Sequence, residues 1–343
     1  KYYKEENLAT INDVAKKAGV SITTVSHVIN DTRFVSQELR NKVNQAIIDV
    51  GYFPNQLARG LRSGVTATVG LMIPDNSNPF FAEVAKIIET VGFENGYSVI
   101  LCNSSGDIKK EAAYIDTLLS HQIDGIILIS VNSALESLQK IKARNIPFVV
   151  VDRDISLYEG DTVLVNNEMG GYHATKYLLE LGHRKIACIE GSSNVNPSSD
   201  RAKGYIRALQ LEGIPVRQDY IAIGDFDYQS GEQGFEKLWS LEDKPTAIFA
   251  CNDMMAIGAL KKAKSMGVHI PEDVSLIGFD DITFTSAVSP ALTTISQPIE
   301  ELSKKAISIL INKIQNRGDF HENKRIILNT ELVIRESCLP YKN

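Results

Sequence analysis

The chain has 343 residues, of which 43% are hydrophobic and 23% are charged, and its formal net charge is −6. These totals are ordinary for a soluble globular protein, and the length suggests two or three domains. No apolar run approaches the roughly 18 residues of a membrane span, and the initial segment KYYKEENLAT lacks the apolar core of a secretory signal. We therefore expect a cytoplasmic protein with no membrane partner.

The charge is unevenly distributed along the chain. Residues 1–65 carry nine Lys or Arg and six acidic residues, which gives this part +3 and leaves −9 on the remainder. This asymmetry indicates a small basic head on an acidic body, and only the head could favour nucleic-acid phosphates. The four cysteines lie far apart without a zinc-ligand spacing, and we expect them to be buried free thiols.

The head has the pattern of three short helices. From Thr10 the apolar spacing predicts an amphipathic helix that ends at Gly19, a residue suited to a left-handed C-cap. Ser21 is a good N-cap for a second helix, and residues 36–52 have the apolar spacing of a third. Two helices joined by a tight turn with glycine, the second with small polar side chains on its free face, form the helix-turn-helix pattern of DNA-binding proteins.

Two segments of the head, ATINDVAKKAGVSITTVSHVIND and VGYFPNQLARGLRSG, resemble the lactose-repressor (LacI) family of bacterial transcription regulators. In that family the second helix enters the major groove of operator DNA. Thr23, Thr24 and His27 can hydrogen-bond base edges there, and the resemblance adds a base or backbone contact from Arg33. Because one helix-turn-helix reads a half-site, we expect a homodimer on a palindromic operator.

The segment NQLARGLRSG after Pro54 is too short to form a stable isolated helix. The resemblance implies a hinge helix that folds only on the operator and pushes Leu61 into the minor groove. An apolar wedge of this kind kinks the duplex at the centre of the site. Arg59 and Arg62 would flank the wedge and face the DNA backbone.

The body alternates strands with helices. Continuously apolar strands in such an alternation indicate parallel sheets covered on both faces, and the pattern breaks near residues 162–171. We therefore expect an α/β fold of two doubly wound lobes, with a ligand cleft at the carboxyl ends of their strands. The expected strands are 69–74, 97–103, 125–130, 147–152, 185–190, 246–250 and 274–279.

Enzyme signatures are absent from the sequence. It contains no phosphate-binding glycine loop, no nucleophile elbow and no HExxH motif, and its six histidines lack metal-ligand spacing. The body is therefore interpreted as a binding module that has no catalytic residues, cofactor or metal.

The body resembles the periplasmic sugar-binding proteins, and ten of its positions agree with the ribose-binding pattern. Carboxylates, amides and arginines can hydrogen-bond adjacent sugar hydroxyls, and aromatic rings can cover the apolar faces of the sugar. Seven of the ten positions are polar and three are aromatic. The expected effector-binding residues are Asn78, Phe80, Phe81, Asp152, Arg153, Arg201, Phe226, Asn252, Asp280 and Gln297.

The resemblance divides the chain into four parts. Residues 8–54 form the helix-turn-helix domain, 55–65 the hinge, 66–167 with 298–329 the first lobe, and 168–297 with 330–343 the second lobe. The expected function is repression of ribose uptake or catabolism genes, with release of the operator when D-ribose binds. The alternatives are a purine-corepressed regulator, a catabolite-control regulator with a protein partner, and, outside the family, a solute-binding module or enzyme.

Overall fold

The computed structural model describes residues 9–53, 65–129, 134–155, 158, 160–192, 196–317 and 322–342. The chain forms two compact units, which meet in the sequence between Thr66 and Ala67. The first unit contains the head and the second contains the body, and each is described separately below.

The head is a bundle of three helices, α1 (Ile11–Ala18), α2 (Ile22–Asn30) and α3 (Gln37–Val50). Helix α1 ends at Gly19, whose positive φ of 64° lets the chain turn sharply into α2. The hydroxyl of Ser21 caps α2 by accepting a hydrogen bond from the Thr24 N–H at 3.0 Å. The helices meet around a small apolar core of Val14, Ala15, Ala18, Val25, Val28, Val43 and Ala46.

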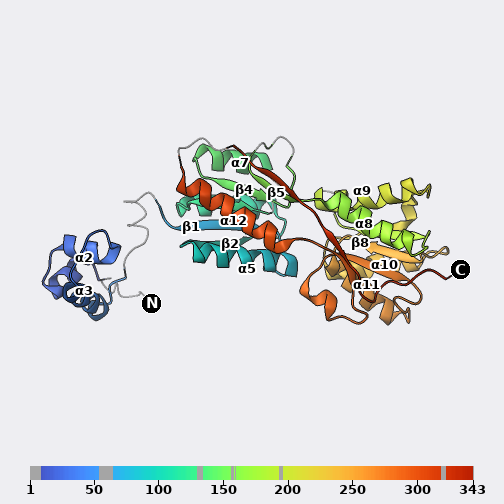
Figure 1. Cartoon of the computed structure of the whole chain (residues 1–343), viewed down its shortest axis with the longest axis horizontal. Helices are drawn as coiled ribbons and strands as arrows, with labels where there is room; N and C mark the ends of the chain where they lie inside the picture. The colour runs from blue at the N-terminus through green and yellow to red at the C-terminus, as the bar shows by residue number, and fades with distance from the viewer. Residues whose placement is uncertain are drawn as a thin grey trace, which may run out of the picture. The chain divides into compact units, whose positions relative to one another are not determined.

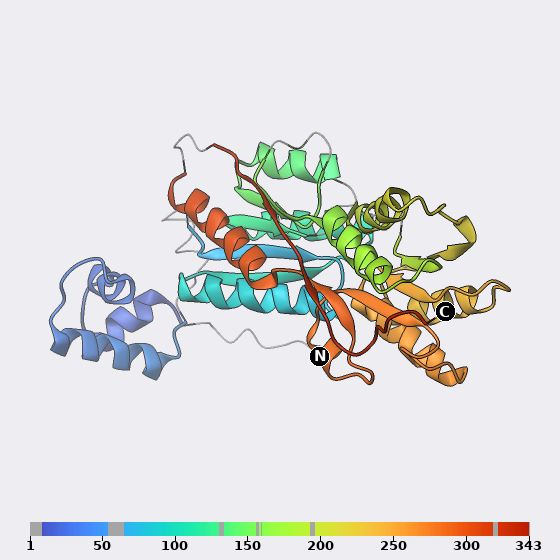
Figure 2. The ribbon, with the colours of Figure 1, turned by 45° about the vertical axis from the view of Figure 1, so that its right-hand side comes forward.

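The first lobe of the body is a six-stranded sheet in the order β11-β5-β4-β3-β1-β2, and its pairings are parallel. Its strands lie between α7 and α5 in Figures 1 and 2. Helices α5 and α12 pack on one face and α6 and α7 on the other, as parallel apolar strands require. The bounds are β1 (Thr68–Ile73), α5 (Pro79–Glu94), β2 (Ser98–Asn103), α6 (Ile108–Ser120), β3 (Gly125–Leu128), α7 (Ala134–Ala143), β4 (Phe148–Val151), β5 (Thr162–Val165), α12 (Ile299–Gln315) and β11 (Arg325–Leu328).

The second lobe is a six-stranded sheet in the order β12-β10-β9-β8-β6-β7, in which β12 alone is antiparallel to its neighbour. Helices α8 and α9 pack against each other, as do α10 and α11. The bounds are α8 (Asn167–Glu180), β6 (Ile186–Glu190), α9 (Asn196–Leu211), η1 (Gln218–Tyr220), β7 (Ile221–Ile223), α10 (Tyr228–Trp239), β8 (Ala247–Ala250), α11 (Asp253–Ser265), β9 (Ser275–Asp280), η2 (Thr283–Ser286), β10 (Thr293–Ser296) and β12 (Glu331–Val333).

The chain passes between the two sheets in three places. Strand β5 leads into α8 at Asn166, β10 leads into α12 through Gln297 and Pro298, and β11 leads into β12 through Asn329 and Thr330. Figures 1 and 2 both follow the last of these as a dark red segment that runs from one lobe to the other. Because each lobe is built from distant parts of the sequence, a movement between the lobes must bend these three segments.

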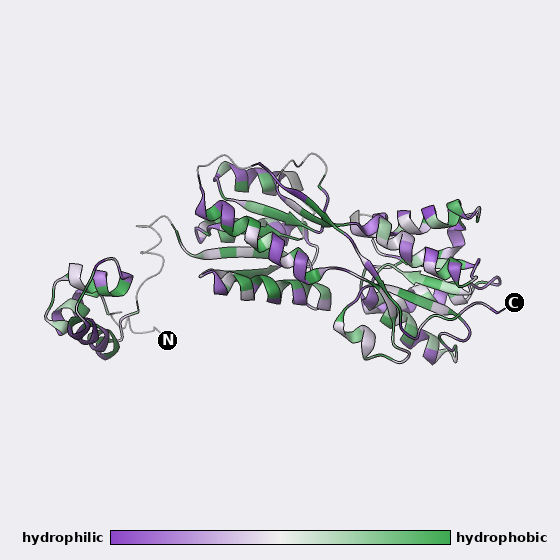
Figure 3. Ribbon diagram, viewed as in Figure 1, coloured by the Kyte–Doolittle hydropathy of each residue, from purple (hydrophilic) through white to green (hydrophobic). Residues whose placement is uncertain are grey.

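The expected fold class, a helix-turn-helix head followed by two lobes of parallel sheet, is confirmed. The sequence pattern did not predict the strands β5, β7, β10, β11 and β12, each of which has only three or four residues. Residues 162–171 in particular were interpreted as a break, whereas they hold β5 and the start of α8. Figure 3 shows the main strands as predominantly hydrophobic and the helices as mixed. Within the described residues, no helix is long and apolar enough to cross a membrane.

Candidate functional site

The side chains expected to read DNA lie on and just after α2. Thr23 and Arg33 are exposed, and Thr24 and His27 are half-buried. Two of these side chains already have partners within the head. The Thr24 hydroxyl is 2.8 Å from the hydroxyl of Ser21, and Nδ1 of His27 is 2.7 Å from the hydroxyl of Thr32. Thr23 and Arg33 are therefore the most accessible of the four expected contacts, while the expected hinge contacts Arg59, Leu61 and Arg62 lie outside the described residues.

The body contains a cavity of about 410 Å³ that both lobes line. Nine of the ten expected effector residues line it. Most of them lie in the segments that follow the carboxyl ends of the strands, where ligands bind in sheets of this kind, and Arg201 lies on α9. Gln297 is the exception, since it lines a second hollow along α12 instead. The lining residues are Pro74, Asp75, Asn78, Phe80, Phe81, Ser105, Gly106, Asp152, Arg153, Pro197, Arg201, Asp225, Phe226, Asp227, Asn252 and Asp280.

The segment that follows β1 brings two phenylalanines to the cavity. Asn78 is the N-cap of α5, and its side-chain oxygen accepts a hydrogen bond from the Phe80 N–H at 3.0 Å. Pro79 occupies the first turn, where its missing N–H costs no hydrogen bond. The ring of Phe80 is only 3% exposed and meets the half-buried ring of Phe81 edge to face, with 5.0 Å between the ring centres. Phe80 thus belongs to the apolar core as well as to the cavity wall, and Phe81 is the more accessible ring.

Asp152 and Arg153 follow β4 in the first lobe. Oδ1 of Asp152 and Nε of Arg153 are buried, and neither has a hydrogen-bond partner. Burial raises the pKa of Asp152 against the opposing effect of the Arg201 and Arg153 guanidinium groups, and burial also lowers the pKa of Arg153. A buried acceptor beside a buried donor costs free energy unless a partner is supplied, so this pair is prepared to meet a polar ligand.

Arg201, on α9 in the second lobe, is held from several sides. Its Nε donates to Oδ1 of Asn167 at 2.8 Å and its Nη1 to the carbonyl oxygen of Cys251 at 2.6 Å. Nη1 also lies 3.1 Å from Oδ1 of Asp280, and the guanidinium group stacks 3.7 Å above the ring of Phe279. These contacts set the orientation of the Arg201 side chain in the cavity wall.

Asp280 completes this second-lobe network at the end of β9. Its Oδ1 accepts a hydrogen bond from Nε2 of Gln297 at 2.7 Å, while Oε1 of Gln297 is buried without a hydrogen-bond partner. Burial raises the pKa of Asp280 to about 6, opposed by Arg201 and Gln297 and reinforced by the nearby Asp152. Behind it the fully buried Asp253, whose pKa is also raised by burial and by Asp280, accepts hydrogen bonds from Thr294 and the Ile282 N–H.

Three cavity residues have backbone conformations that side-chain-bearing residues rarely adopt. The φ angles are 63° for Asp152, 62° for Phe226 and 119° for Asp280. Strained conformations of this kind cost free energy and concentrate at functional sites. Phe226 is also fitted against Gly191, since a Cβ at that position would lie 2.5 Å from its ring. Asn252 supports the same turn by donating to the Phe226 carbonyl oxygen at 2.8 Å.

Seven lining residues were not predicted from the sequence: Pro74, Asp75, Ser105, Gly106, Pro197, Asp225 and Asp227. All of them lie in loops that follow strands or at the first turn of a helix. Asp225 and Asp227 flank the predicted Phe226, so the proximity of charged residues to a candidate ring was an available signal. With these residues the cavity holds five aspartates and two arginines, which disfavours an anionic ligand.

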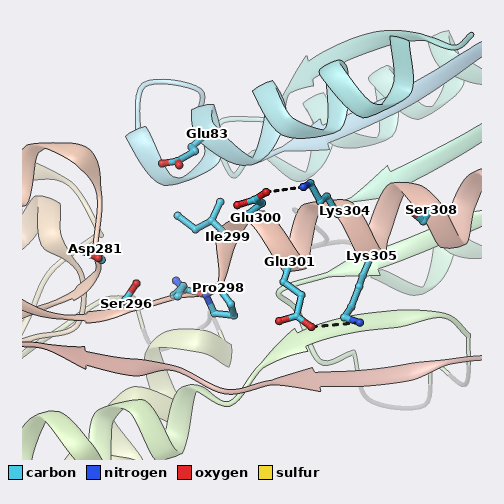
Figure 4. Close-up of a pocket in the computed structure, with 11 residues that line it drawn as sticks. Glu83, Asp281, Ser296, Pro298, Ile299, Glu300, Glu301, Lys304, Lys305 and Ser308 are labelled. Carbon is cyan, nitrogen blue, oxygen red and sulfur yellow. Dashed lines mark hydrogen bonds and ion pairs between the residues drawn. The ribbon is translucent and has the colours of Figure 1, made fainter. Parts of the chain in front are cut away.

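A larger hollow of about 740 Å³ runs along α12. Figure 4 shows that its charged side chains face one another across successive helix turns, with Glu300 paired to Lys304 and Glu301 to Lys305. Its lining contains no aromatic ring, and its lysines are already neutralised within the helix. The smaller cavity between the lobes is thus the better candidate site. Nowhere in the described residues do three or more His, Cys, Asp or Glu side chains gather to hold a metal ion.

Comparisons with known proteins agree with this architecture. Residues 10–55 match the family of bacterial regulatory proteins of the lacI type, and residues 66–336 match the periplasmic binding proteins and sugar binding domain of the LacI family. The HTH-type transcriptional repressor PurR of Aliivibrio salmonicida is 38% identical over 331 residues, which cover 96% of this chain and 99% of that protein.

Two solved structures extend the comparison. A LacI-family transcriptional regulator from Enterococcus faecium with bound ribose is 31% identical, with a TM-score of 0.73, and the match covers 80% of this chain and 100% of that one. The lac repressor dimer bound to operator and the anti-inducer ONPF is 26% identical, with a TM-score of 0.84, and the match covers 97% and 100% of the two chains. The chain therefore belongs to the LacI family and is a DNA-binding transcriptional repressor, not an enzyme.

Proposed function

We propose that this repressor binds D-ribose, or a closely related neutral sugar, in the cavity between its lobes and then releases its operator. The observation that carries the proposal is the unpartnered pair of Asp152 Oδ1 and Arg153 Nε. A hydroxyl group both donates and accepts, so two adjacent sugar hydroxyls can satisfy the acceptor and the donor together. Phe81 and Phe226 offer rings to the apolar faces of the sugar.

A purine corepressor is the second candidate, and the names of the curated relatives favour it over a sugar. Proteins named HTH-type transcriptional repressor PurR, such as that of Aliivibrio salmonicida, match this chain over 96% of its length. A flat base could lie against the same phenylalanines and present a donor and an acceptor at its edge. Support for the sugar comes from the ribose-bound Enterococcus faecium structure and from the number of polar groups around the cavity.

The DNA-binding side of the proposal places α2 in the major groove. Thr23, Thr24, His27 and Arg33 contact bases or nearby backbone there, and residues 55–65 form a hinge in which Leu61 enters the minor groove between Arg59 and Arg62. Within the body, the first lobe comprises residues 66–167 and 298–329, and the second comprises 168–297 and 330–343. The helix-turn-helix domain, residues 8–54, binds one half-site of a palindromic operator.

The homodimer that a palindromic operator requires would also cover exposed apolar residues at the β2 edge of the first-lobe sheet. Strand β2 is the outer strand of its sheet, and its Leu101 is 45% exposed. Phe93 of the adjoining helix α5 is 74% exposed. Apolar residues on an open sheet edge invite pairing with another chain, and proteins normally cover or charge such edges. Because the operator has two-fold symmetry, a second copy of the chain is the partner that we expect to cover this edge.

The test measures operator affinity with each candidate ligand. The operator would first be selected from a pool of random duplexes by the full chain, and its dissociation constant would then be measured by mobility shift alone, with ribose and with guanine. Weaker binding with ribose and no change with guanine supports the sugar proposal. Tighter binding with guanine and no change with ribose replaces it with purine corepression, and no selected DNA at all would contradict the assigned head.

A further inference from the structure

Asn167 joins the ligand cavity to one of the three segments that connect the lobes. It is the first residue of α8, two positions beyond the end of β5, and its side chain is only 6% exposed. Its Oδ1 accepts the hydrogen bond from Arg201 Nε at 2.8 Å, and its Nδ2 donates to the carbonyl oxygen of Val165 at 3.3 Å. One amide group therefore touches both the cavity arginine and the last residue of a first-lobe strand.

The position of this amide matters because its two partners belong to different lobes. Arg201 is carried by α9 of the second lobe and lines the cavity, whereas Val165 ends β5 in the first sheet. The backbone at the same crossing is tied to the neighbouring connection, since the Asn166 N–H donates to the Leu328 carbonyl oxygen at 2.8 Å. A shift of the Arg201 guanidinium group would thus change a hydrogen bond at the place where two of the connecting segments lie side by side.

We propose that Asn167 is a positioning residue that transmits effector binding from Arg201 to the crossing between β5 and α8, and so sets how strongly the effector changes operator affinity. The proposal rests on the proposed function, because it requires an effector in the cavity. Its physical basis is that a ligand changes DNA affinity only through contacts that differ between the two lobe arrangements. The two hydrogen bonds of the Asn167 amide have this role, because they lie at the segment that a movement between the lobes must bend.

The experiment measures the effector response, defined as the ratio of operator dissociation constants with and without saturating ligand. The ligand is whichever of ribose and guanine acts on the unaltered chain, and saturation is set from its own binding curve for each variant. Asn167→Leu keeps the side-chain size and removes both hydrogen bonds. Asn167→Asp keeps the acceptor for Arg201 and loses only the donor to Val165.

Asn166→Ala serves as the matched control, because this neighbour caps α8 through its side chain without touching Arg201. Allosteric responses typically lie between about 5-fold and 150-fold. We expect Asn167→Leu to reduce the response to below about twofold even at saturation, since only the transmitting contact is removed. Asn167→Asp should retain part of the response, because it keeps the contact with Arg201 and loses the one with Val165. Asn166→Ala should lower thermal stability without changing the response.

The results that would contradict the role of Asn167 differ from those that would contradict the proposed function. If Asn167→Leu responds like the unaltered chain, or if Asn166→Ala loses the response equally, Asn167 has no special role in transmission. Failure of Asn167→Asp to restore the response would also overturn the proposal, because the acceptor for Arg201 would then be irrelevant. If the unaltered chain responds to neither ligand, the proposed function itself fails. Should Asn167→Leu not fold, Asn167→Ala removes the same two bonds without adding bulk and gives the same decision.

Discussion

The two lobes contribute to the cavity in different ways. In the second lobe, Arg201 and Asp280 are bound to each other and to Asn167, Gln297 and the Cys251 carbonyl. In the first lobe, Asp152 Oδ1 and Arg153 Nε are buried without partners. The second lobe therefore holds the more fully bonded half of the site, which we call the finished half although Gln297 Oε1 is also without a partner, and the first lobe holds a half that a ligand would complete.

This difference separates stability from binding. Residues of the finished half hold the protein together whether or not ligand is present, because buried charges there compensate each other. Residues of the first-lobe half, which we call the unfinished half, reduce stability in the free protein because their polar atoms lack partners. This destabilisation is removed only when a ligand supplies their hydrogen bonds. Substitutions in the two halves should consequently have opposite signatures, which the following experiments test.

The largest effect is expected from Arg201→Met. Removing the cation leaves Asp280 buried without its partner, and we expect the free energy of unfolding to fall by about 3 kcal/mol or more. Urea denaturation followed by the fluorescence of Trp239, the single tryptophan of the chain, would measure this. The control Arg207→Met, on the same helix, removes an exposed ion pair with Glu168 and should change stability by less than about 0.5 kcal/mol. Equal losses in both variants would contradict the view that the second lobe is held by its buried pair.

The next effect is expected from Asp152→Asn in the unfinished half. Loss of a charge-assisted hydrogen bond should weaken ligand binding at least about tenfold, measured by titration calorimetry. Stability of the free protein should stay the same or increase, because the substitution removes a buried charge that has an unpartnered oxygen. Asp154→Asn is the control, since this exposed neighbour pairs with Arg325 instead. A marked loss of stability in Asp152→Asn would place Asp152 with the structural residues.

The sequence identified the strand ends of the cavity but not how the side chains there are bonded. Apolar runs predicted the central strands, and the resemblance to the ribose-binding pattern predicted nine of the lining residues. The unpartnered state of Asp152 and the support of Arg201 by Asn167 depend on contacts between residues far apart in sequence, which no local pattern encodes. Gln297, the tenth expected residue, does not line the cavity, but it is hydrogen-bonded to the cavity residue Asp280.

The short strands β5 and β11 illustrate the same limit. Each has four residues and pairs with the other across more than 150 positions of sequence. Such strands are fixed by tertiary pairing more than by their own pattern, so the connection that contains Asn167 looked like an interruption. The expected base contacts Thr24 and His27 were predicted as free polar side chains, and their hydrogen bonds to Ser21 and Thr32 could not be read from spacing.

A smaller effect is expected from Phe81→Ala. This half-buried ring lines the cavity on the first-lobe side, and its loss should weaken ligand binding by about five- to tenfold because an aromatic contact of this kind contributes about 1 kcal/mol or slightly more. Operator affinity without ligand should remain nearly unchanged, as measured by mobility shift. Loss of operator binding in this variant would mean that Phe81 belongs to the core together with Phe80.

A separate effect is a pH dependence of stability in the second lobe. Burial raises the pKa of Asp280 to about 6, so the folded chain binds this proton more tightly than the unfolded chain. The resulting stabilisation is complete below the unfolded pKa of about 4 and is lost as the pH rises through about 6. The amide introduced by Asp280→Asn would not titrate, so this variant should not lose stability in this way as the pH rises. The stability of this variant relative to the unaltered chain should therefore improve between pH 4.5 and about pH 7.5. A difference that is constant with pH, or that declines, would contradict the raised pKa.

The most direct test of the account is the operator dissociation constant of the full chain, measured with and without saturating ribose for the unaltered protein and for Asp152→Asn. We expect ribose to weaken operator binding by the unaltered protein at least about fivefold. Asp152→Asn should bind the operator equally well without ligand and need at least about tenfold more ribose for the same response. Unchanged or tighter operator binding by the unaltered protein in ribose would contradict a sugar-released repressor, and tighter binding in guanine would assign the cavity to a purine corepressor.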